Sequence, residues 1–253
     1  QMLEKEKEAR LSLESELADA YQIQMSLLPK SAPEIKGLEI SGRSIAAKEV
    51  GGDFFDYLIS EDELQICIAV GDVSGKGLRG AMNAVMASGI LRLASTENPR
   101  ASMDVLMSKL NKALCQNMER DMNVTMVLAQ LDTDKKQMAL ANAGQHAYPL
   151  LVRNGVAEPV KAKGLALGMI PTISYELTTV DVKSGDLLLF MTDGITEPRS
   201  VQGLMYQESG RLDEVLSNIQ AEISVDSVLD IITSDVMNYS VDDDLTLVVV
   251  RVL

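Results

Sequence analysis

The chain contains the segment Leu64-Gln65-Ile66-Cys67-Ile68-Ala69-Val70-Gly71-Asp72-Val73-Ser74-Gly75-Lys76-Gly77, in which an apolar run passes into a glycine-rich turn that carries one aspartate. The run at 64–70 is short, rich in β-branched residues and bounded by glycine, which predicts a buried strand. Residues 78–93 follow with an apolar, helix-like pattern. The segment therefore predicts a strand, a turn and a helix, with Asp72 where the strand ends.

This turn lies in a strand-turn-helix setting that can bind anions, because helix N-termini carry free N–H groups. A nucleotide-binding P-loop would need Gly, four residues and then Gly-Lys-Ser/Thr. Here three residues separate Gly71 from Gly75, and Gly77 stands where the hydroxyl would be. The sequence therefore excludes a P-loop. For Lys76 and Arg79, contact with phosphate stays an alternative to a simple solvated position at the helix start.

Three further segments carry aspartate beside an apolar, strand-like run: Gly51-Gly52-Asp53-Phe54-Phe55-Asp56, Thr192-Asp193-Gly194 and Asp242-Asp243-Asp244-Leu245-Thr246. Carboxylates gathered at strand ends repel one another unless cations lie between them. Hard cations such as Mg²⁺ and Mn²⁺ prefer carboxylate, carbonyl and water oxygens. Together with Asp72, these segments predict a carboxylate-lined metal site.

The alternation of side chains along a strand decides which aspartates can face one site. Asp53 and Asp56 are three residues apart and point to opposite faces, so we expect Asp53 to face the site and Asp56 to be structural. The adjacent residues Asp242, Asp243 and Asp244 cannot all line one site. We expect Asp242 to be a solvated turn residue, and both Asp243 and Asp244 stay candidates.

Strand-like and helix-like segments follow one another beyond Pro33 without a βαβ rhythm, and hairpin-length turns such as Asn154-Gly155 join several strands. The expected strands are 38–46, 55–59, 64–70, 124–131, 137–143, 148–152, 175–181, 187–191 and 245–252. Besides the helix after Gly77, we expect one helix that starts at Asn98-Pro99 and one that Ser224 caps. Helices covering packed antiparallel sheets give an α+β fold, an α-β-β-α sandwich.

The composition excludes several classes of protein. The 253 residues are 46% apolar, with 23 basic against 37 acidic side chains and a net charge of −14. That charge opposes binding to polyanions, so nucleic acid is not an expected partner. Cys67 and Cys115 are expected to be buried thiols without a disulfide, which fits the cytoplasm. We find no signal peptide and no run of the ~20 apolar residues that span a bilayer, so we expect no membrane contact by this chain, whose start at Gln1 suggests an excised fragment.

Residues 1–28 contain neither Gly nor Pro and predict one long helix that Pro29 and Pro33 end. Its seam residues recur at alternating spacings of four and three: Leu13, Leu17, Ala20, Gln24 and Leu27. The pattern indicates a coiled coil, through which two chains could form a homodimer. Because it covers fewer than four clean heptads, an amphipathic helix packed on its own domain stays the alternative. We expect a helical linker at 1–29 and one main domain at 30–253.

Five motifs occur in an order that resembles the bacterial serine phosphatases of the RsbU and SpoIIE type, which belong to the metal-dependent (type 2C, PPM) protein phosphatase superfamily. The motifs are Glu49-Val50-Gly51-Gly52-Asp53-Phe54-Phe55-Asp56, Gly71-Asp72-Val73-Ser74-Gly75-Lys76-Gly77, Asn142-Ala143-Gly144, Thr192-Asp193-Gly194-Ile195-Thr196-Glu197 and Asp243-Asp244-Leu245-Thr246. Several ordered motifs are more specific than any one alone. The resemblance covers residues 22–253. It implies two stacked antiparallel sheets with a binuclear Mg²⁺ or Mn²⁺ site at one edge.

By match to the family motifs, the resemblance implies that Asp72 bridges the two metal ions and that the backbone carbonyl of Val73 binds one of them. Asp193 and Asp243 would complete the set, and Asp53 would bind directly or through water. Two such ions activate a shared water for in-line attack on a phosphoryl group. The implied substrate is phosphoserine or phosphothreonine on a regulatory protein, an anti-sigma-factor antagonist of the STAS type. The N-terminal helix would transmit control from an upstream sensor.

The acid that protonates the leaving serine oxygen is not assigned by the sequence. Eukaryotic type 2C enzymes carry a histidine two residues after the bridging aspartate, where this chain has Ser74. Its single histidine, His146, is expected to be a structural or solvated loop residue rather than a general acid. Water would then supply the proton.

Two other classes of protein stay open. A catalytically weak relative could keep the fold and act as a dimeric docking module, although the retention of all four aspartates argues against it. A calcium-binding protein is a weaker alternative, because the loop pattern Asp-x-Asp/Asn-x-Asp/Asn-Gly is absent.

Overall fold

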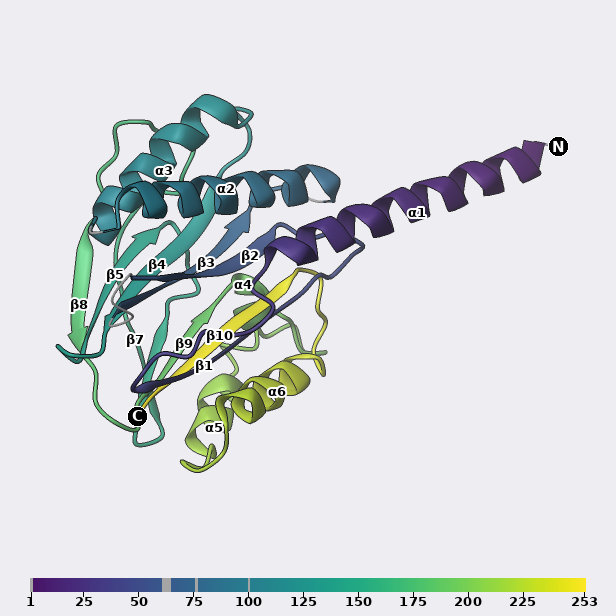
Figure 1. Cartoon of the computed structure of the whole chain (residues 1–253). Coiled ribbons are helices and arrows are strands. Elements are labelled where there is room, and N and C mark those ends of the chain that lie inside the picture. The colour runs from purple at the N-terminus through teal and green to yellow at the C-terminus, as the bar shows by residue number, and fades with distance from the viewer. Residues whose placement is uncertain (1, 61–64, 76, 100) are drawn as a thin grey trace.

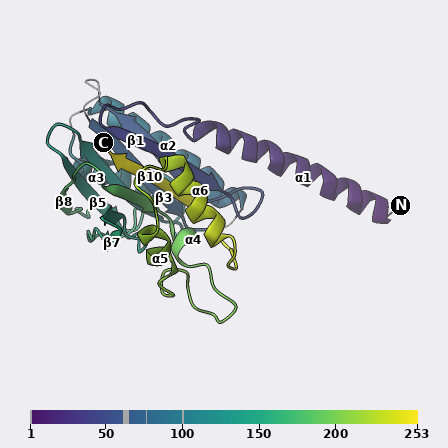
Figure 2. The same ribbon diagram turned by 90° about the horizontal axis from the view of Figure 1, so that it is seen from below.

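The computed structural model describes residues 2–60, 65–75, 77–99 and 101–253 (Figure 1). Two five-stranded antiparallel sheets face each other, helices cover the outer face of each sheet, and a long N-terminal helix extends outwards (Figures 1 and 2). The expected α-β-β-α sandwich is confirmed. Leu64, at the start of the expected strand 64–70, and Lys76 lie outside the described residues.

Each sheet is built from strands that pair only in the antiparallel sense, as expected for a chain without βαβ units. In order across the first sheet, the strands are β1 (Leu38–Ile45), β10 (Leu245–Val252), β9 (Leu187–Met191), β6 (Leu150–Arg153) and β7 (Val156–Pro159). The second sheet consists of β2 (Asp53–Ile59), β3 (Gln65–Val73), β4 (Val124–Asp132), β5 (Gln137–Ala143) and β8 (Leu177–Asp181).

All nine expected strands occur, with ends that differ by a few residues. The tenth strand, β7, forms a hairpin with β6 through the Asn154-Gly155 turn, where both residues have positive φ (53° and 76°). Positive φ at both central positions defines the type I′ turn that the Asn-Gly pair predicts. The more consequential difference is at β3, which continues through Asp72 to Val73. Asp72 is thus a strand residue with a fixed facing.

Alternating residues of the central strands supply two different apolar layers. In β3, Ile66, Ile68 and Val70 point into the layer between the sheets. Cys67 and Ala69 point the other way, into the layer under α2 (Leu78–Glu97) and α3 (Met103–Asn117). A strand that buries both faces needs an unbroken apolar run, which is the pattern seen in the sequence. The first sheet is covered in the same way by α5 (Arg211–Ser217) and α6 (Val225–Val236).

The helix ends agree with the sequence at α6 and differ at α3. At α6, the Ser224 side chain accepts a hydrogen bond from the Ser227 N–H (3.2 Å), as an N-cap does. The expected helix start at Asn98-Pro99 is wrong, because Asn98 ends α2 and Ser102 precedes α3. Pro99 therefore lies in the short loop between α2 and α3 and not in the first turn of a helix. A short helix, α4 (Asp193–Thr196), was not expected at all.

Four chain segments meet at one end of the sandwich because of strand direction. β2 begins at Asp53, which pairs in register with Asp72 near the end of β3. In the first sheet, β9 ends just before Asp193, beside the start of β10. The four aspartate segments of the sequence are therefore neighbours in the fold, although up to 191 positions separate Asp53 from Asp244 in the chain.

The N-terminal helix α1 (Met2–Leu27) contacts the domain only near its C-terminal end, where it meets α2, and the rest extends away from the sandwich (Figures 1 and 2). An amphipathic helix packed along its own domain is therefore not what the structure has. Along the extended part, Leu11 is 52% exposed. Of the seam residues, Leu17 and Ala20 are half-buried, Gln24 is buried, and the side chain of Leu13 lies outside the description.

Two smaller expectations concern the thiols and the bilayer. Cys67 is buried as expected, whereas Cys115 is only half-buried, and neither forms a disulfide. Within the described residues, we find no helix with the length and apolar character that crossing a bilayer requires.

The close approach of α4 to β10 gives a first testable prediction. A methyl group added at Gly194 would overlap the backbone carbonyl oxygen of Asp244, whereas one added at Gly89 in α2 would meet open space. Gly194→Ala should therefore lower the free energy of unfolding by roughly 1–3 kcal/mol, because an overpacked site must shift its backbone. Gly89→Ala, the matched control, should raise it by up to about 1 kcal/mol through helix propensity. Urea denaturation of both variants measures this, and equal stability would contradict the close packing.

Candidate metal centre

Asp53 and Asp72 face each other across the β2–β3 pair, on the same face of the second sheet. Directly opposed like charges destabilise a sheet. Asp53 is only 4% exposed, and its Oδ2 accepts a hydrogen bond from the Thr192 hydroxyl (2.6 Å). Burial, and then the charge of Asp72, raise the pKa of Asp53 well above its usual range, while hydrogen bonds from Thr192 and Thr246 act in the opposite direction. This pair alone would favour a nearby cation.

The pKa of Asp72 is also affected by the carboxylates of the other two segments. Its pKa is raised to about 7, first by burial and then by the negative charges of Asp193, Asp243 and Asp244. The pKa of Asp193 is likewise raised by burial and by Asp243. Asp72 is thus the carboxylate whose charge interacts with those of all the others, namely Asp53, Asp193, Asp243 and Asp244.

Asp243 and Asp244, which strand alternation leaves as two candidates, have different environments. Asp244 is 7% exposed, and its carboxylate accepts hydrogen bonds from the backbone N–H groups of Ala47 (2.8 Å), Gly52 (2.7 Å) and Asp53 (3.4 Å). The carboxylate oxygens of Asp244 therefore accept the hydrogen bonds that hold the loop before β2. Asp243 is exposed, and one of its oxygens accepts only the adjacent N–H of Asp244 (2.9 Å). Asp242 is exposed, as expected for a solvated turn residue.

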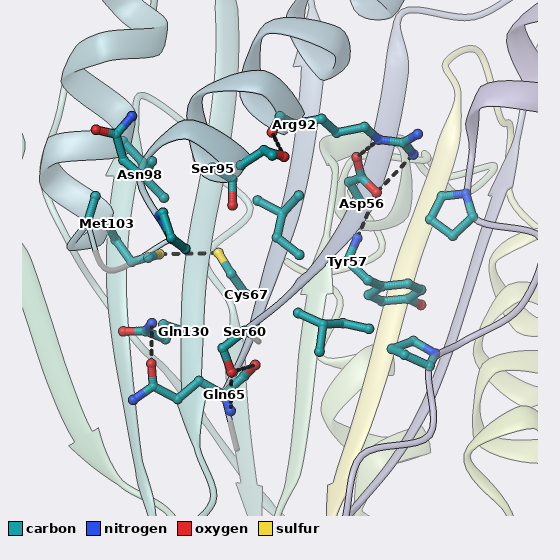
Figure 3. Close-up of a pocket in the computed structure, with 18 of the residues that line it drawn as sticks. Asp56, Tyr57, Ser60, Gln65, Cys67, Arg92, Ser95, Asn98, Met103 and Gln130 are labelled. Atoms are coloured by element: carbon teal, nitrogen blue, oxygen red, sulfur yellow. Dashed lines mark hydrogen bonds and ion pairs between the residues drawn. The ribbon is translucent and has the colours of Figure 1, made fainter. Parts of the chain in front are cut away.

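Asp56 lies on the opposite face from Asp53, as alternation predicts. Its buried carboxylate forms an ion pair with Arg92 and accepts a hydrogen bond from the Tyr57 N–H (2.9 Å), shown in Figure 3. The cavity drawn there, of about 720 Å³, lies beside β2 and the 29–33 linker and contains none of the other aspartates. Asp56 therefore has a structural role, and this large cavity is separate from the carboxylate group.

Two smaller cavities adjoin the carboxylates. One, of about 130 Å³, is lined by Asp72, Val73 and Asp243, among others. The other, of about 190 Å³, is lined by Asp193, Asp243 and Arg199, among others. Asp243 lines both cavities, so the two cavities are neighbours and residues of all four segments line one or both of them.

Gly52 leaves this region open beside the oxygens that the sequence singled out. A Cβ atom built at Gly52 would lie 2.6 Å from the Val73 carbonyl oxygen and 3.3 Å from Asp72 Oδ1. Any side chain here would fill the space beside two hard oxygen donors. Hard oxygen donors with net negative charge fit Mg²⁺ or Mn²⁺. Within the described residues, no three aspartate, glutamate, histidine or cysteine side chains lie close enough together to hold a metal ion as they stand.

Other polar side chains nearby have ordinary structural partners. Ser74, which stands where eukaryotic relatives have histidine, accepts a hydrogen bond from the Asn123 N–H (2.8 Å). His146 is exposed on its loop. Arg79 pairs with Glu119 and Asp121 at the protein surface, and Lys76 lies outside the described residues.

Sequence reasoning missed several residues that support the site. Thr192 and Thr246 were read only as parts of motifs, although both interact with Asp53. The anchoring role of Asp244 was also missed. Alternation along a strand gives facing, but it gives no information about which hydroxyl from the opposite sheet reaches a carboxylate.

Comparison with known proteins places this geometry in a family. The sequence matches the family model described as Stage II sporulation protein E (SpoIIE) over residues 62–253. It is 28% identical over 244 residues to "Phosphoserine phosphatase RsbU" of Bacillus subtilis, covering 94% of this chain and 70% of that protein.

Two solved structures show the same fold. The SiaA-PP2C domain of Pseudomonas aeruginosa has a TM-score of 0.82 and 21% identity, covering 96% of this chain and 98% of that one. The RsbU and RsbW domains of Rv1364c from Mycobacterium tuberculosis have a TM-score of 0.78 and 22% identity, covering 89% of this chain. The chain spans 62% of that structure, less than two thirds of its length. With most of its length matched by the family model and with the PP2C fold around its aspartates, the chain belongs to the SpoIIE family of PP2C-type serine phosphatases.

Proposed function

We propose that this protein hydrolyses phosphoserine or phosphothreonine on a regulatory protein, using two divalent cations, Mn²⁺ or Mg²⁺, held by Asp72, Asp193 and Asp243. The observation that carries the proposal is the position of Asp72, which faces Asp53 in the β2–β3 register and lines one cavity together with Asp243. Grouping buried like charges is unfavourable unless cations compensate them. Family membership supports the reaction class.

In this proposal, each residue of the site has a separate role toward the metal ions. Asp72 would contact both ions, because it is the carboxylate that interacts with each of the others. The Val73 carbonyl would contact one ion in the space that Gly52 leaves open. Asp53, held by the Thr192 hydroxyl, would act on the ions directly or through water. Asp244 would hold the 47–53 loop and would not be a ligand.

Bound in such a site, two divalent ions supply a hydroxide at neutral pH and neutralise developing charge on the phosphoryl oxygens. The protein's own contribution is to position the carboxylates. Asp53 and Asp72 lie on paired strands, which hold a site more precisely than loops do, and Asp193 and Asp243 lie next to the ends of β9 and β10. His146 is exposed on its loop and Ser74 Oγ accepts a hydrogen bond from the Asn123 N–H, and this proposal assigns neither as a general acid. Water would protonate the leaving serine oxygen.

The substrate in this proposal is a STAS-type anti-sigma-factor antagonist, by analogy with the resemblance to RsbU-type enzymes. The chain's net charge of −14 is compatible with a protein partner and unfavourable for a nucleic acid. A panel of phosphorylated antagonist proteins, incubated with and without Mn²⁺, tests the substrate class.

Control through the N-terminal helix, as part of the same proposal, is supported by two contacts at the end of α1. Gln24 Nε2 donates to the Gly51 carbonyl (2.6 Å), and Gly51 N–H donates back to Gln24 Oε1 (3.3 Å). Arg92 Nη2 donates to the Leu27 carbonyl (2.7 Å) while pairing with Asp56 (Figure 3). Gly51 is two residues from Asp53, so a displacement of α1 would act directly on the start of β2.

A homodimer through α1 completes the proposal. Of the seam residues, Leu27 is 37% exposed and Leu17 and Ala20 are half-buried, on a helix that extends into solvent. A second copy of the helix would cover them in a coiled coil. The alternative function, a catalytically weak docking module, would keep this dimer and lack turnover. Hydrolysis of an aryl phosphate with added Mn²⁺ discriminates between the two.

The different environments of Asp243 and Asp244 predict opposite effects of the same substitution. Asp243→Ala should lower Mn²⁺-dependent turnover by roughly 100-fold or more, beyond the 10–100-fold typical of outer-shell changes. Its stability should change by less than about 0.5 kcal/mol, because the side chain is exposed. Asp244→Ala should lower the free energy of unfolding by roughly 1–3 kcal/mol or more, because buried N–H groups lose their acceptor. Turnover assays and urea denaturation measure both, and the reverse assignment of effects would refute the separation of roles.

The raised pKa of Asp72 predicts how the metal-free protein responds to pH. Its pKa is about 7 in the folded protein against 3.8 for an ordinary aspartate. Between pH 3.8 and pH 7, Asp72 is protonated in the folded chain and ionised in the unfolded chain. The contribution of this proton to the free energy of unfolding is therefore full below pH 4 and is lost progressively as the pH rises towards 7. In EDTA, the melting temperature should therefore fall from pH 4.5 to 7.5 more for the wild type than for Asp72→Asn. Saturating Mn²⁺ should reverse the fall. Equal pH profiles for the two proteins would contradict the charge cluster.

The contact between α1 and the loop gives a fourth prediction. Gln24→Ala removes both hydrogen bonds to Gly51, whereas Gln22→Ala, on an exposed position of the same helix, removes none that the structure shows. Gln24→Ala should change Mn²⁺-dependent turnover by roughly 3–10-fold, the equivalent of one or two net hydrogen bonds. Deletion of residues 1–28 should have at least as large an effect. Behaviour of Gln24→Ala identical to that of Gln22→Ala would show that α1 does not act on the site.

A further inference from the structure

One arginine lies at the edge of the carboxylate group without an acidic partner. Arg199 lines the cavity of about 190 Å³ together with Asp193, Asp243, Glu197 and Asp242. It is the one basic side chain among the lining residues described for this cavity. An arginine surrounded by acidic residues would ordinarily form a salt bridge. In the described part of the chain, Arg199 forms none, unlike Arg92, Arg153 and Arg211.

The position of Arg199 is fixed by the backbone. Arg199 and Ser240 exchange backbone hydrogen bonds (3.4 and 2.9 Å), which attach the loop after α4 to the segment before β10. One guanidinium nitrogen, Nη1, donates to the Gly203 carbonyl (2.9 Å). A guanidinium carries five N–H donors, so most of its capacity is left for a ligand. The side chain is exposed and can be reached from solvent.

The chemistry of the proposed substrate defines what such a guanidinium would bind. A phosphoserine phosphoryl group is a dianion with three strong acceptor oxygens. Metal ions held by the carboxylates would contact one side of the phosphoryl group. Its remaining oxygens would then be bound by residues at the edge of the cavity, where Arg199 lies. The planar fork of arginine matches phosphate bidentately, which a lysine ammonium does not. Lys48, which lines the neighbouring cavity, is a point charge on a flexible stem.

We infer that Arg199 binds the phosphoryl group of the substrate and the inorganic phosphate product. This inference rests on the proposed function, because it places the phosphoryl group between the carboxylate site and the Arg199 rim. It adds a recognition residue that belongs to none of the aspartate motifs. Arg199 is a substrate contact in this account, whereas its hydrogen bond to Gly203 is a structural one.

A pair of substitutions separates binding from structure. Arg199→Gln removes the charge and keeps an N–H donor for the Gly203 carbonyl, whereas Arg199→Lys keeps the charge and loses the planar fork. Lys183→Ala is the control for net charge. Lys183 is exposed in the 183–185 turn, and the Gly185 N–H of this turn donates to the Val252 carbonyl at the far end of β10. At 3.3 Å per strand residue, this end lies roughly 23 Å from Leu245, where β10 begins beside the aspartates.

The measurements are the affinity for [³²P]phosphate by equilibrium dialysis in Mn²⁺, the KM and kcat for an aryl phosphate, Mn²⁺ affinity and the melting temperature. Arg199→Gln should weaken phosphate binding and raise KM by roughly tenfold, the loss typical of one charge-assisted hydrogen bond. Mn²⁺ affinity and melting temperature should stay those of the wild type. Arg199→Lys should recover part of the loss, and Lys183→Ala should match the wild type.

Two results would overturn the inference in distinguishable ways. If the wild type turns over the aryl phosphate and Arg199→Gln binds phosphate within twofold of it, Arg199 is structural and the inference alone fails. If the wild type shows neither Mn²⁺ binding nor turnover, the proposed function fails and the inference fails with it. A tenfold loss in Lys183→Ala would mean that net charge, rather than a contact, governs phosphate affinity, which also overturns the inference.

Discussion

Repulsion between carboxylates is the constraint around which this end of the protein is organised. Asp53 and Asp72 are brought face to face by the β2–β3 register, and Asp193 and Asp243 approach from the opposite sheet. Burial makes each charge more costly and weakens the screening between them. A fold that keeps such a group must compensate it by protons or by cations. At neutral pH, divalent cations are the stronger compensation.

The two sheets provide the rigidity that this arrangement needs. Apolar layers cover both faces of each sheet, and β10, which lies between β1 and β9, begins directly after the 242–244 aspartate segment. Hydrogen bonds then cross between the sheets, from Thr192 to Asp53 and from the 47–53 loop to Asp244. Asp53 and Asp72 are therefore positioned by two paired strands, and Asp193 and Asp243 lie next to strand ends. Gln24 of α1 forms hydrogen bonds with Gly51 of the same loop, which connects the site to the N-terminal helix.

Much of this could be predicted from the sequence, because the relevant signals are local. Apolar runs gave nine strands, Asn154-Gly155 gave a hairpin, and alternation separated Asp53 from Asp56. Contacts between distant segments could not be predicted in the same way. Nothing in the order Asp242-Asp243-Asp244 indicates that the third residue accepts N–H groups from a loop about 190 positions away. The partnership of Thr192 with Asp53 and the position of Arg199 also depend on how the two sheets stack.

The central claim is that carboxylates from separate segments hold a pair of divalent cations at one edge of the sandwich. Anomalous diffraction from a crystal grown with Mn²⁺, recorded at the manganese edge, tests it most directly. The account predicts two adjacent anomalous peaks, with Asp72 in contact with both and with Asp193 and Asp243 each in contact with at least one. Ordered density for these three carboxylates with no manganese peak between them, at a Mn²⁺ concentration that supports turnover, would contradict it.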